Sequence, residues 1–189
     1  MRRQVMAVTA AVVVALSLTA CNGGSSGSAT PPPFTPSSVP PASSTTPSEH
    51  PGSDGAVEAY RQFIAATDAM GRSGGADVTG LRKYSSGTML AAELNQAATF
   101  KGRKWRSVGQ QKVVRAKVLT TGTPGPDGAV NEVVVEACVD SSQAITTGPD
   151  GKPVRPANAP TQLVDQMKMV RVAGAWTANY PHSRKPGKC

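Results

Sequence analysis

Three cysteines carry the most reactive side chains of this chain, and the surroundings of the first indicate where the protein folds. Cys21 stands where an apolar run, residues 5–18, gives way to a polar tract. Arg2 and Arg3 precede the run, so residues 1–20 show the basic, apolar and small-residue parts of a secretory signal peptide. The run is about 14 residues long, short of the roughly 20 that a membrane-spanning helix needs. We therefore expect residues 1–20 to direct export.

The residues around Cys21 indicate what happens to its thiol. Leu18-Thr19-Ala20-Cys21 resembles the bacterial lipobox. That resemblance implies that Cys21 receives a diacylglycerol through a thioether and that a signal peptidase cuts just before it. Two acyl chains give stable membrane attachment. We expect a lipoprotein on the extracytoplasmic face of the cell membrane; the alternative is ordinary secretory cleavage near Ala20, which leaves Cys21 as a free thiol.

The other two cysteines form an even pair once Cys21 is lipidated. Cys138 and Cys189 then fold in an oxidising compartment, where disulfides form and persist. We predict a disulfide between them, which would also hold a tail, residues 181–188, that is otherwise too polar to dock. The alternative is two separate thiols, one buried and one at a frayed end.

Composition divides the chain into three parts. After the leader, residues 21–52 contain Cys21 and a tract rich in Pro, Ser, Thr and Gly, with Glu49 as its only formal charge. Such a tract buries too little apolar surface to fold, so we predict a disordered linker. Residues 53–189 are long enough for one domain with one core. The chain has a net charge of +8, which becomes +6 when Arg2 and Arg3 leave with the leader.

The hydrophobic period predicts helices first and strands afterwards in the domain. Apolar residues three or four apart predict helices at 55–70, 78–84 and 87–100, with Met89, Leu90, Leu94 and Ala97 on one side of the third. Strands are predicted at 108–121, 130–139, 164–172 and 175–180, separated by turns rich in Gly and Pro. We expect an α+β domain with the helices packed on a curved antiparallel sheet of about four strands.

Four short motifs resemble those of small actinobacterial secreted lipoproteins with a nuclear-transport-factor-2-like, or cystatin-like, cone domain. They are Val57-x-x-Tyr60-x-x-Phe63, Leu81-x-x-Tyr84-Ser85-Ser86-Gly87, Ala137-Cys138-Val139-Asp140 and Val172-Ala173-Gly174-Ala175-Trp176. The resemblance implies a sheet wrapped around helices that enclose a cone-shaped pocket. Members include ketosteroid-isomerase-like and polyketide-cyclase-like enzymes and many proteins with no known activity.

Enzymes of that kind place Asp, His or Tyr in the cone for proton transfer. His50 lies in the linker and His182 in the tail, which leaves Asp68 and Asp140, with Tyr60 and Tyr84 as hydroxyl partners. We expect Asp68 to be a solvated helix residue, Asp140 to cap the turn at Ser141-Ser142, and both tyrosines to be core aromatics. We therefore expect no catalysis. The sequence shows neither metal-ligand spacing nor a phosphate-binding glycine loop, so we expect no metal and no cofactor.

Basic residues gather in one short segment. Lys101, Arg103, Lys104 and Arg106 surround Trp105, while Arg115, Lys117 and three cations of the tail add to the charge. Outside the cell, anionic wall polymers or lipid headgroups are better partners for such a patch than nucleic acid; the alternative is a solvated loop. Three functions follow: a lipid-anchored, non-catalytic binding module for a small ligand or an envelope protein; a basic wall- or membrane-associating accessory protein; and a cone-fold isomerase or cyclase-like enzyme.

Overall fold

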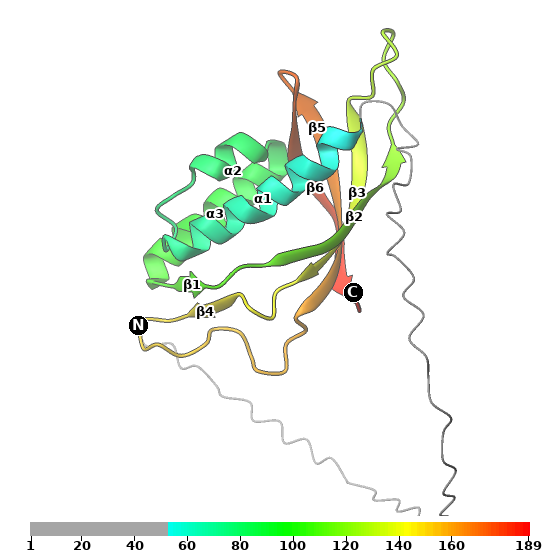
Figure 1. The fold of residues 1–189 in the computed structure, drawn as a ribbon. Coiled ribbons are helices and arrows are strands. Elements are labelled where there is room, and N and C mark those ends of the chain that lie inside the picture. The colour runs from blue at the N-terminus through cyan, green and yellow to red at the C-terminus, as the bar shows by residue number, and fades with distance from the viewer. Residues whose placement is uncertain (1–52) are drawn as a thin grey trace, which may run out of the picture. The chain divides into compact units, whose positions relative to one another are not determined.

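The computed structural model describes residues 53–189 (Figure 1). The predicted signal peptide (1–20), the predicted lipidation site Cys21 and the predicted linker (21–52) lie outside the described residues. Within the described part, three helices precede six strands, and the strands form antiparallel sheets. The predicted α+β class is therefore confirmed.

The three helices form close to where the apolar period predicts them. They are α1 (Asp54–Arg72), α2 (Thr79–Tyr84) and α3 (Gly87–Arg103). Buried apolar side chains of α1 recur three or four residues apart, as expected for one helix face: Ala56, Tyr60, Phe63, Ala66 and Met70, with Ile64 beside them. None of the helices in residues 53–189 has the length and apolarity needed to cross a membrane.

The buried face of α3 is shifted from the apolar side that the sequence predicts. Met89 and Ala97 are buried as predicted, but Glu93 and Phe100 share their face, while Leu90 and Leu94 are half-buried. The buried residues Met89, Glu93 and Ala97 are therefore each four positions apart, and Glu93 lies in the middle of the buried face. An acidic side chain consequently enters the interior of the domain.

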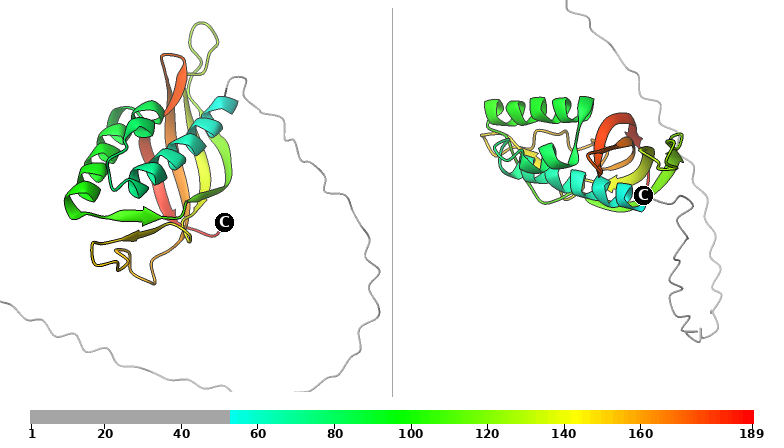
Figure 2. Two further views of the ribbon diagram at one scale, coloured as in Figure 1. Left: turned by 60° about the vertical axis from the view of Figure 1, so that its left-hand side comes forward. Right: turned by 90° about the horizontal axis from the view of Figure 1, so that it is seen from above.

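The four-stranded sheet has the order β2-β3-β5-β6 and is antiparallel throughout. Its strands are β2 (Lys112–Thr121), β3 (Glu132–Asp140), β5 (Gln162–Val172) and β6 (Ala175–Pro186). The helices lie together on one side of this sheet (Figures 1 and 2). The core between α1 and the sheet is built from alternating residues of β3 and β5, including Val133, Val135, Met167 and Met169.

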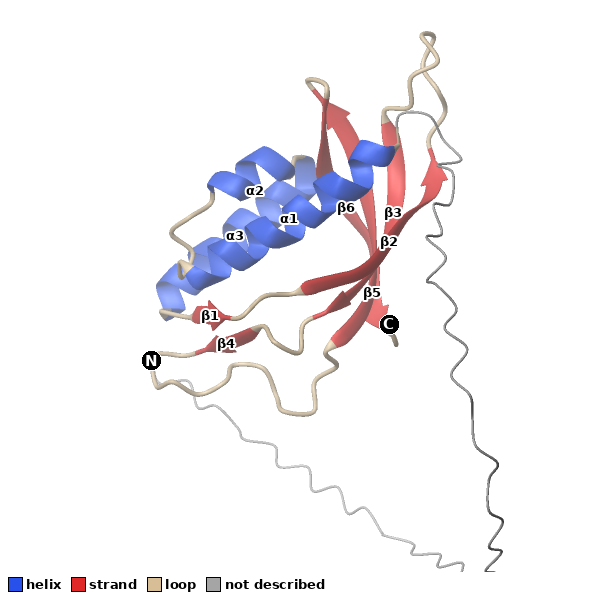
Figure 3. Ribbon diagram, viewed as in Figure 1, coloured by secondary structure: helices blue, strands red, loops and turns tan. Residues whose placement is uncertain are grey.

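The predicted strand 108–121 is divided into two. Gly109, at φ 75°, separates β2 from β1 (Arg106–Val108), and a Cβ atom there would overlap the carbonyl of Gln143. β1 pairs with β4 (Ile145–Thr147), a short strand that the sequence pattern did not predict. This ribbon lies beyond the end of the main sheet, beside α1 (Figure 3).

The last strand is longer than predicted. The sequence predicts its end at residue 180, but pairing with β5 continues to Pro186. The tail that we expected the disulfide to hold is therefore largely part of the sheet. Strand β6 lies at the sheet edge, where prolines such as Pro181 and Pro186 are tolerated. Two of its polar side chains are held by partners on β5: Arg184 pairs with Asp165, and Ser183 donates a hydrogen bond to Gln166.

The predicted disulfide is confirmed. Cys138 of β3 is bonded to Cys189, just after the end of β6, with a Cα–Cα distance of 5.5 Å. Cys138 is buried in the sheet. The bond therefore ties the C-terminus to the centre of the fold.

Candidate functional site

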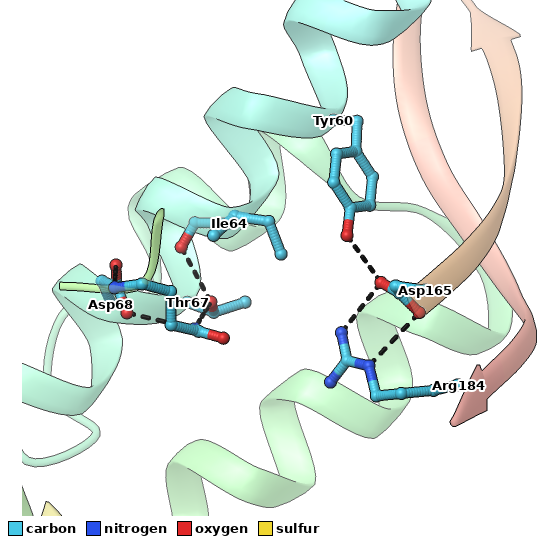
Figure 4. A network of polar contacts seen from close by, with 7 residues as sticks. Tyr60, Ile64, Thr67, Asp68, Asp165 and Arg184 are labelled. Carbon is cyan, nitrogen blue, oxygen red and sulfur yellow. Dashed lines mark hydrogen bonds and ion pairs between the residues drawn. The ribbon is translucent and has the colours of Figure 1, made fainter. Parts of the chain in front are cut away.

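A buried carboxylate on β5 connects three elements of the fold (Figure 4). Tyr60 of α1 donates a hydrogen bond to Asp165 Oδ2 at 2.7 Å. Arg184 of β6 reaches the same carboxylate from the other side, with Nε 3.2 Å from Oδ1 and Nη2 2.9 Å from Oδ2. Asp165 is 1% exposed, whereas the side chain of Arg184 is 46% exposed. The group is a bidentate ion pair with a phenol as third donor.

The charges of this group favour a structural role. Burial and the negative charge of Asp165 raise the pKa of Tyr60 well above its usual value, so its phenol keeps its proton. Burial alone would lower the pKa of Arg184, but its hydrogen bond to Asp165 and the charge of that carboxylate raise it overall. Tyr60 is a core aromatic, as predicted, and its hydroxyl holds Asp165 in place.

Beside this ion pair lies a cavity of about 240 Å³ between α1, α3, the β1–β4 ribbon and the ends of β5 and β6. Its walls combine apolar side chains with Asp68, Glu93, Arg155 and Arg184. At about 30 Å³ per water molecule, its volume corresponds to about eight waters. The site therefore has room for a small ligand.

Glu93 is the unusual residue of this cavity. It is 7% exposed, and its Oε2 atom has no hydrogen-bond partner among the described residues. Burial raises the pKa of Glu93 to about 7, although the nearby charge of Arg184 opposes the shift. Buried polar atoms are almost always paired, so an unpaired carboxylate oxygen beside a cavity indicates a missing donor.

Asp68 lines the same cavity, and the expectation that it is solvated is wrong. It is 8% exposed and accepts hydrogen bonds from the backbone N–H of Gln111 at 2.9 Å and from Gln111 Nε2 at 3.1 Å. Burial raises the pKa of Asp68, while both bonds from Gln111 act against the shift. Gln111, in the short segment between β1 and β2, lies against α1, which is why this helix residue is covered.

The two remaining candidates for proton transfer do not line the cavity. Asp140 accepts a hydrogen bond from the backbone N–H of Ser142 at 2.8 Å, and this bond lowers its pKa. It caps the turn after β3, as predicted. Tyr84 is half-buried. It packs both against the core between α1 and the sheet and against the core that the three helices form with one another. The ammonium of Lys83 lies 4.9 Å from its ring centre.

Sequence reasoning missed Glu93, Asp165 and Arg184. The signal for Glu93 was its position four residues from both Met89 and Ala97, which puts it on their face of α3. Asp165 alternates with Met167 and Met169, so it shares their inward side of β5. Arg184 had no signal of its own, because its strand was predicted to end at residue 180.

The predicted basic patch forms a second hollow of about 400 Å³ on the surface, lined by Lys101, Lys104, Trp105 and Arg106, with Ser73, Gly74 and Ala76. The guanidinium of Arg103 lies 4.9 Å from the ring centre of Trp105, which itself packs edge-on against Phe100. Arg106 Nη1 donates to the carbonyl of Arg72 at 3.2 Å.

No ion pair within residues 53–189 involves Lys101, Arg103, Lys104 or Arg106. Two of the other predicted cations differ: Lys117 Nζ lies 3.8 Å from Glu136 Oε1, and Arg184 forms an ion pair with Asp165. Of the two tryptophans, Trp176 is buried in the core, and Trp105 is half-buried at the hollow. Over the same residues, no cluster of three or more His, Cys, Asp or Glu side chains has a metal-binding arrangement.

No family model matches the sequence, and no curated protein matches it. Among solved structures, the intermembrane space region of the chloroplast protein ARC6 is similar to this chain, with 14% sequence identity and a TM-score of 0.39. The match covers 70% of this chain and 97% of that one. A likeness this distant carries no argument about function.

Proposed function

We propose that this chain is a lipid-anchored binding module on the extracytoplasmic face of the cell membrane, held by acyl chains on Cys21. Its ligand is a small molecule that occupies the cavity beside Glu93. The leader and the lipobox-like Leu18-Thr19-Ala20-Cys21 support the anchor. Incorporation of labelled palmitate, lost in Cys21→Ser, is the test of that part.

The observation that carries the ligand site is the unpaired Oε2 of Glu93 in an open cavity. A buried carboxylate without donors is costly in the empty protein, and a ligand that donates to it would remove that cost. The arrangement of three helices against one side of a curved antiparallel sheet also supports membership of the nuclear-transport-factor-2-like proteins.

Binding accounts for the site better than catalysis does. Glu93, with a pKa of about 7, has the proton affinity of a general base, and the enzyme alternative, a cone-fold isomerase or cyclase-like activity, depends on it. Asp68 also lines the cavity, but Gln111 holds it as an acceptor through two hydrogen bonds, so the acid partners left are Tyr60 and Arg184. Both are engaged by Asp165, and the raised pKa of each keeps its proton in place.

Native mass spectrometry tests whether the cavity holds a ligand. We expect the full-length protein, extracted in mild detergent, to carry a small bound mass that Ala144→Phe abolishes, because Ala144 lines the cavity. Ala157→Phe is the matched control, since Ala157 is exposed on the loop before β5. A wild-type protein that takes up no molecule from a small-molecule extract of its own cells would contradict the proposal.

The second candidate function is association with anionic wall polymers through Lys101, Arg103, Lys104 and Arg106. It is favoured because these cations line or flank one hollow and have no carboxylate partner within residues 53–189.

Changing the four patch cations together to serine should weaken binding to a phosphate-bearing wall polymer at least tenfold at low salt, because each cation contributes about 1 kcal/mol near a charged surface. The control changes Arg82, Lys83, Lys112 and Lys152, four exposed cations elsewhere on the domain, to serine. Cosedimentation at increasing salt gives the readout. Equal losses in both variants would show that net charge, and not the patch, is responsible.

A further inference from the structure

The cavity beside Glu93 has the walls of a site for an organic molecule. Phe63, Ile64, Met70 and Phe100 line it, together with Leu163. Apolar walls of this kind hold the carbon skeleton of a ligand, while a few polar groups set its orientation. With about 240 Å³ of space, the ligand is small.

Two buried carboxyl groups enter this space from different helices. Asp68 of α1 already accepts two hydrogen bonds from Gln111, so its needs are met within the protein. Glu93 of α3 is 7% exposed and leaves Oε2 without a partner in the described part of the chain. When Glu93 is ionised, this oxygen is an unpaired acceptor in the cavity, and a ligand can supply the donor.

The cations of the cavity do not supply that donor. Arg184 forms its ion pair with Asp165, which neutralises it. Arg155 donates to Ser141, with Nη1 3.0 Å from Oγ and Nη2 3.4 Å from the carbonyl oxygen. The charge of Arg72 acts on Asp68 and offsets it. When Glu93 is ionised, its unpaired carboxylate oxygen is therefore the feature of the cavity that attracts a cation.

We propose that the cavity binds a small organic ammonium ion, whose N–H groups donate to Glu93 Oε2 and whose alkyl body packs against the apolar wall. This assignment rests on the proposed function, in which the cavity is the ligand site. A primary ammonium carries three donors and no acceptor, and its hydrogen bond to a carboxylate is charge-assisted. A carboxylate ligand would meet Glu93 and Asp68 with like charge.

The proposal implies that binding depends on pH. The charged and titratable groups around Glu93 are Asp68 from α1, Arg155 from the loop before β5, Asp165 from β5 and Arg184 from β6, with Tyr60 behind Asp165. Burial raises the pKa of Glu93 to about 7, so the ionised form that binds a cation is lost below neutrality. We expect the affinity for an ammonium ion to fall about tenfold per pH unit below pH 7.

The test compares probes of one shape and different charge on the full-length protein at pH 8. We expect n-butylammonium to bind at least tenfold more tightly than 1-butanol in NMR titrations, and butyrate not to bind. Glu93→Gln should abolish the preference for the amine over the alcohol. Glu93→Asp, which keeps the charge, should retain it. Glu58→Gln, an exposed change on α1, should leave it intact.

The outcomes separate this inference from the proposed function. Tighter binding of butanol or butyrate, or displacement of the amine by calcium chloride, would overturn the ammonium assignment and leave the cavity as a ligand site. An amine that binds equally well to wild type and to a folded Glu93→Gln variant would also overturn it. If Ala144→Phe changes neither the affinity for the probes nor the mass bound to the native protein, both proposals fail.

Discussion

Cys189→Ser is expected to lower the free energy of unfolding by up to about 4 kcal/mol. The disulfide closes a loop with a sequence separation of 51 residues, and the chain-entropy description of the unfolded state gives that figure for a loop of this length. The loss should exceed that of a surface substitution, because the bond joins the buried Cys138, near the end of β3, to the residue that lies just beyond edge strand β6.

The measurement is chemical denaturation of variants that also carry Cys21→Ser, so that no other thiol can exchange. Reductant should lower the stability of the Cys21→Ser protein to that of Cys189→Ser. Reductant should have no effect on the stability of a variant that combines Cys21→Ser, Cys138→Ala and Cys189→Ser. A difference below about 1 kcal/mol between oxidised and reduced protein would show that the native pairing of β6 does not depend on the bond.

Arg184→Met is expected to cost about 3 kcal/mol of folding free energy. Asp165 is 1% exposed, and the substitution removes two of its three hydrogen bonds and its counter-charge. Breaking a buried ion pair on one side leaves an uncompensated charge, which costs about 3–5 kcal/mol. We take the lower end of this range because the side chain of Arg184 is 46% exposed.

A second variant separates the ion pair from the packing of β6. Asp165→Asn together with Arg184→Met should recover part of the lost stability, since a neutral amide can still accept the hydrogen bond of Tyr60 and no longer needs a cation. Lys185→Met, one residue further along the same strand and exposed, is the control and should be nearly neutral. If Arg184→Met and Lys185→Met behave alike, the ion pair does not hold the tail to the sheet.

Local patterns predicted the parts of this fold whose side chains alternate in polarity. The apolar stripe of α1, from Tyr60 to Met70, predicted both the helix and its buried face. The even pair Cys138 and Cys189 predicted the disulfide. The residues of the α1 stripe are close in sequence, and Cys138 and Cys189 are the two cysteines left once Cys21 is assigned to lipidation.

The unpredicted features depend on contacts between distant residues. The last half of β6 reads as a polar tail, and only its pairing with β5 and the ion pair of Arg184 with Asp165 make it a strand. Glu93 breaks the apolar pattern of α3, and its burial follows from the way α3 packs on β6. The short ribbon of β1 and β4 was missed because three-residue strands carry too little pattern.

The central claim is that Glu93 is a buried, unpaired carboxyl group in a cavity open to a cationic ligand. Its most direct test is the pH titration of the Glu93 carboxyl carbon by NMR, with the resonance assigned from its absence in Glu93→Gln. We predict a midpoint near pH 7 in the free protein, because burial favours the neutral form. Saturating n-butylammonium should shift the midpoint downward, because the cation favours the charged form. A midpoint near the ordinary value of 4.5 that the amine leaves unchanged would contradict the claim.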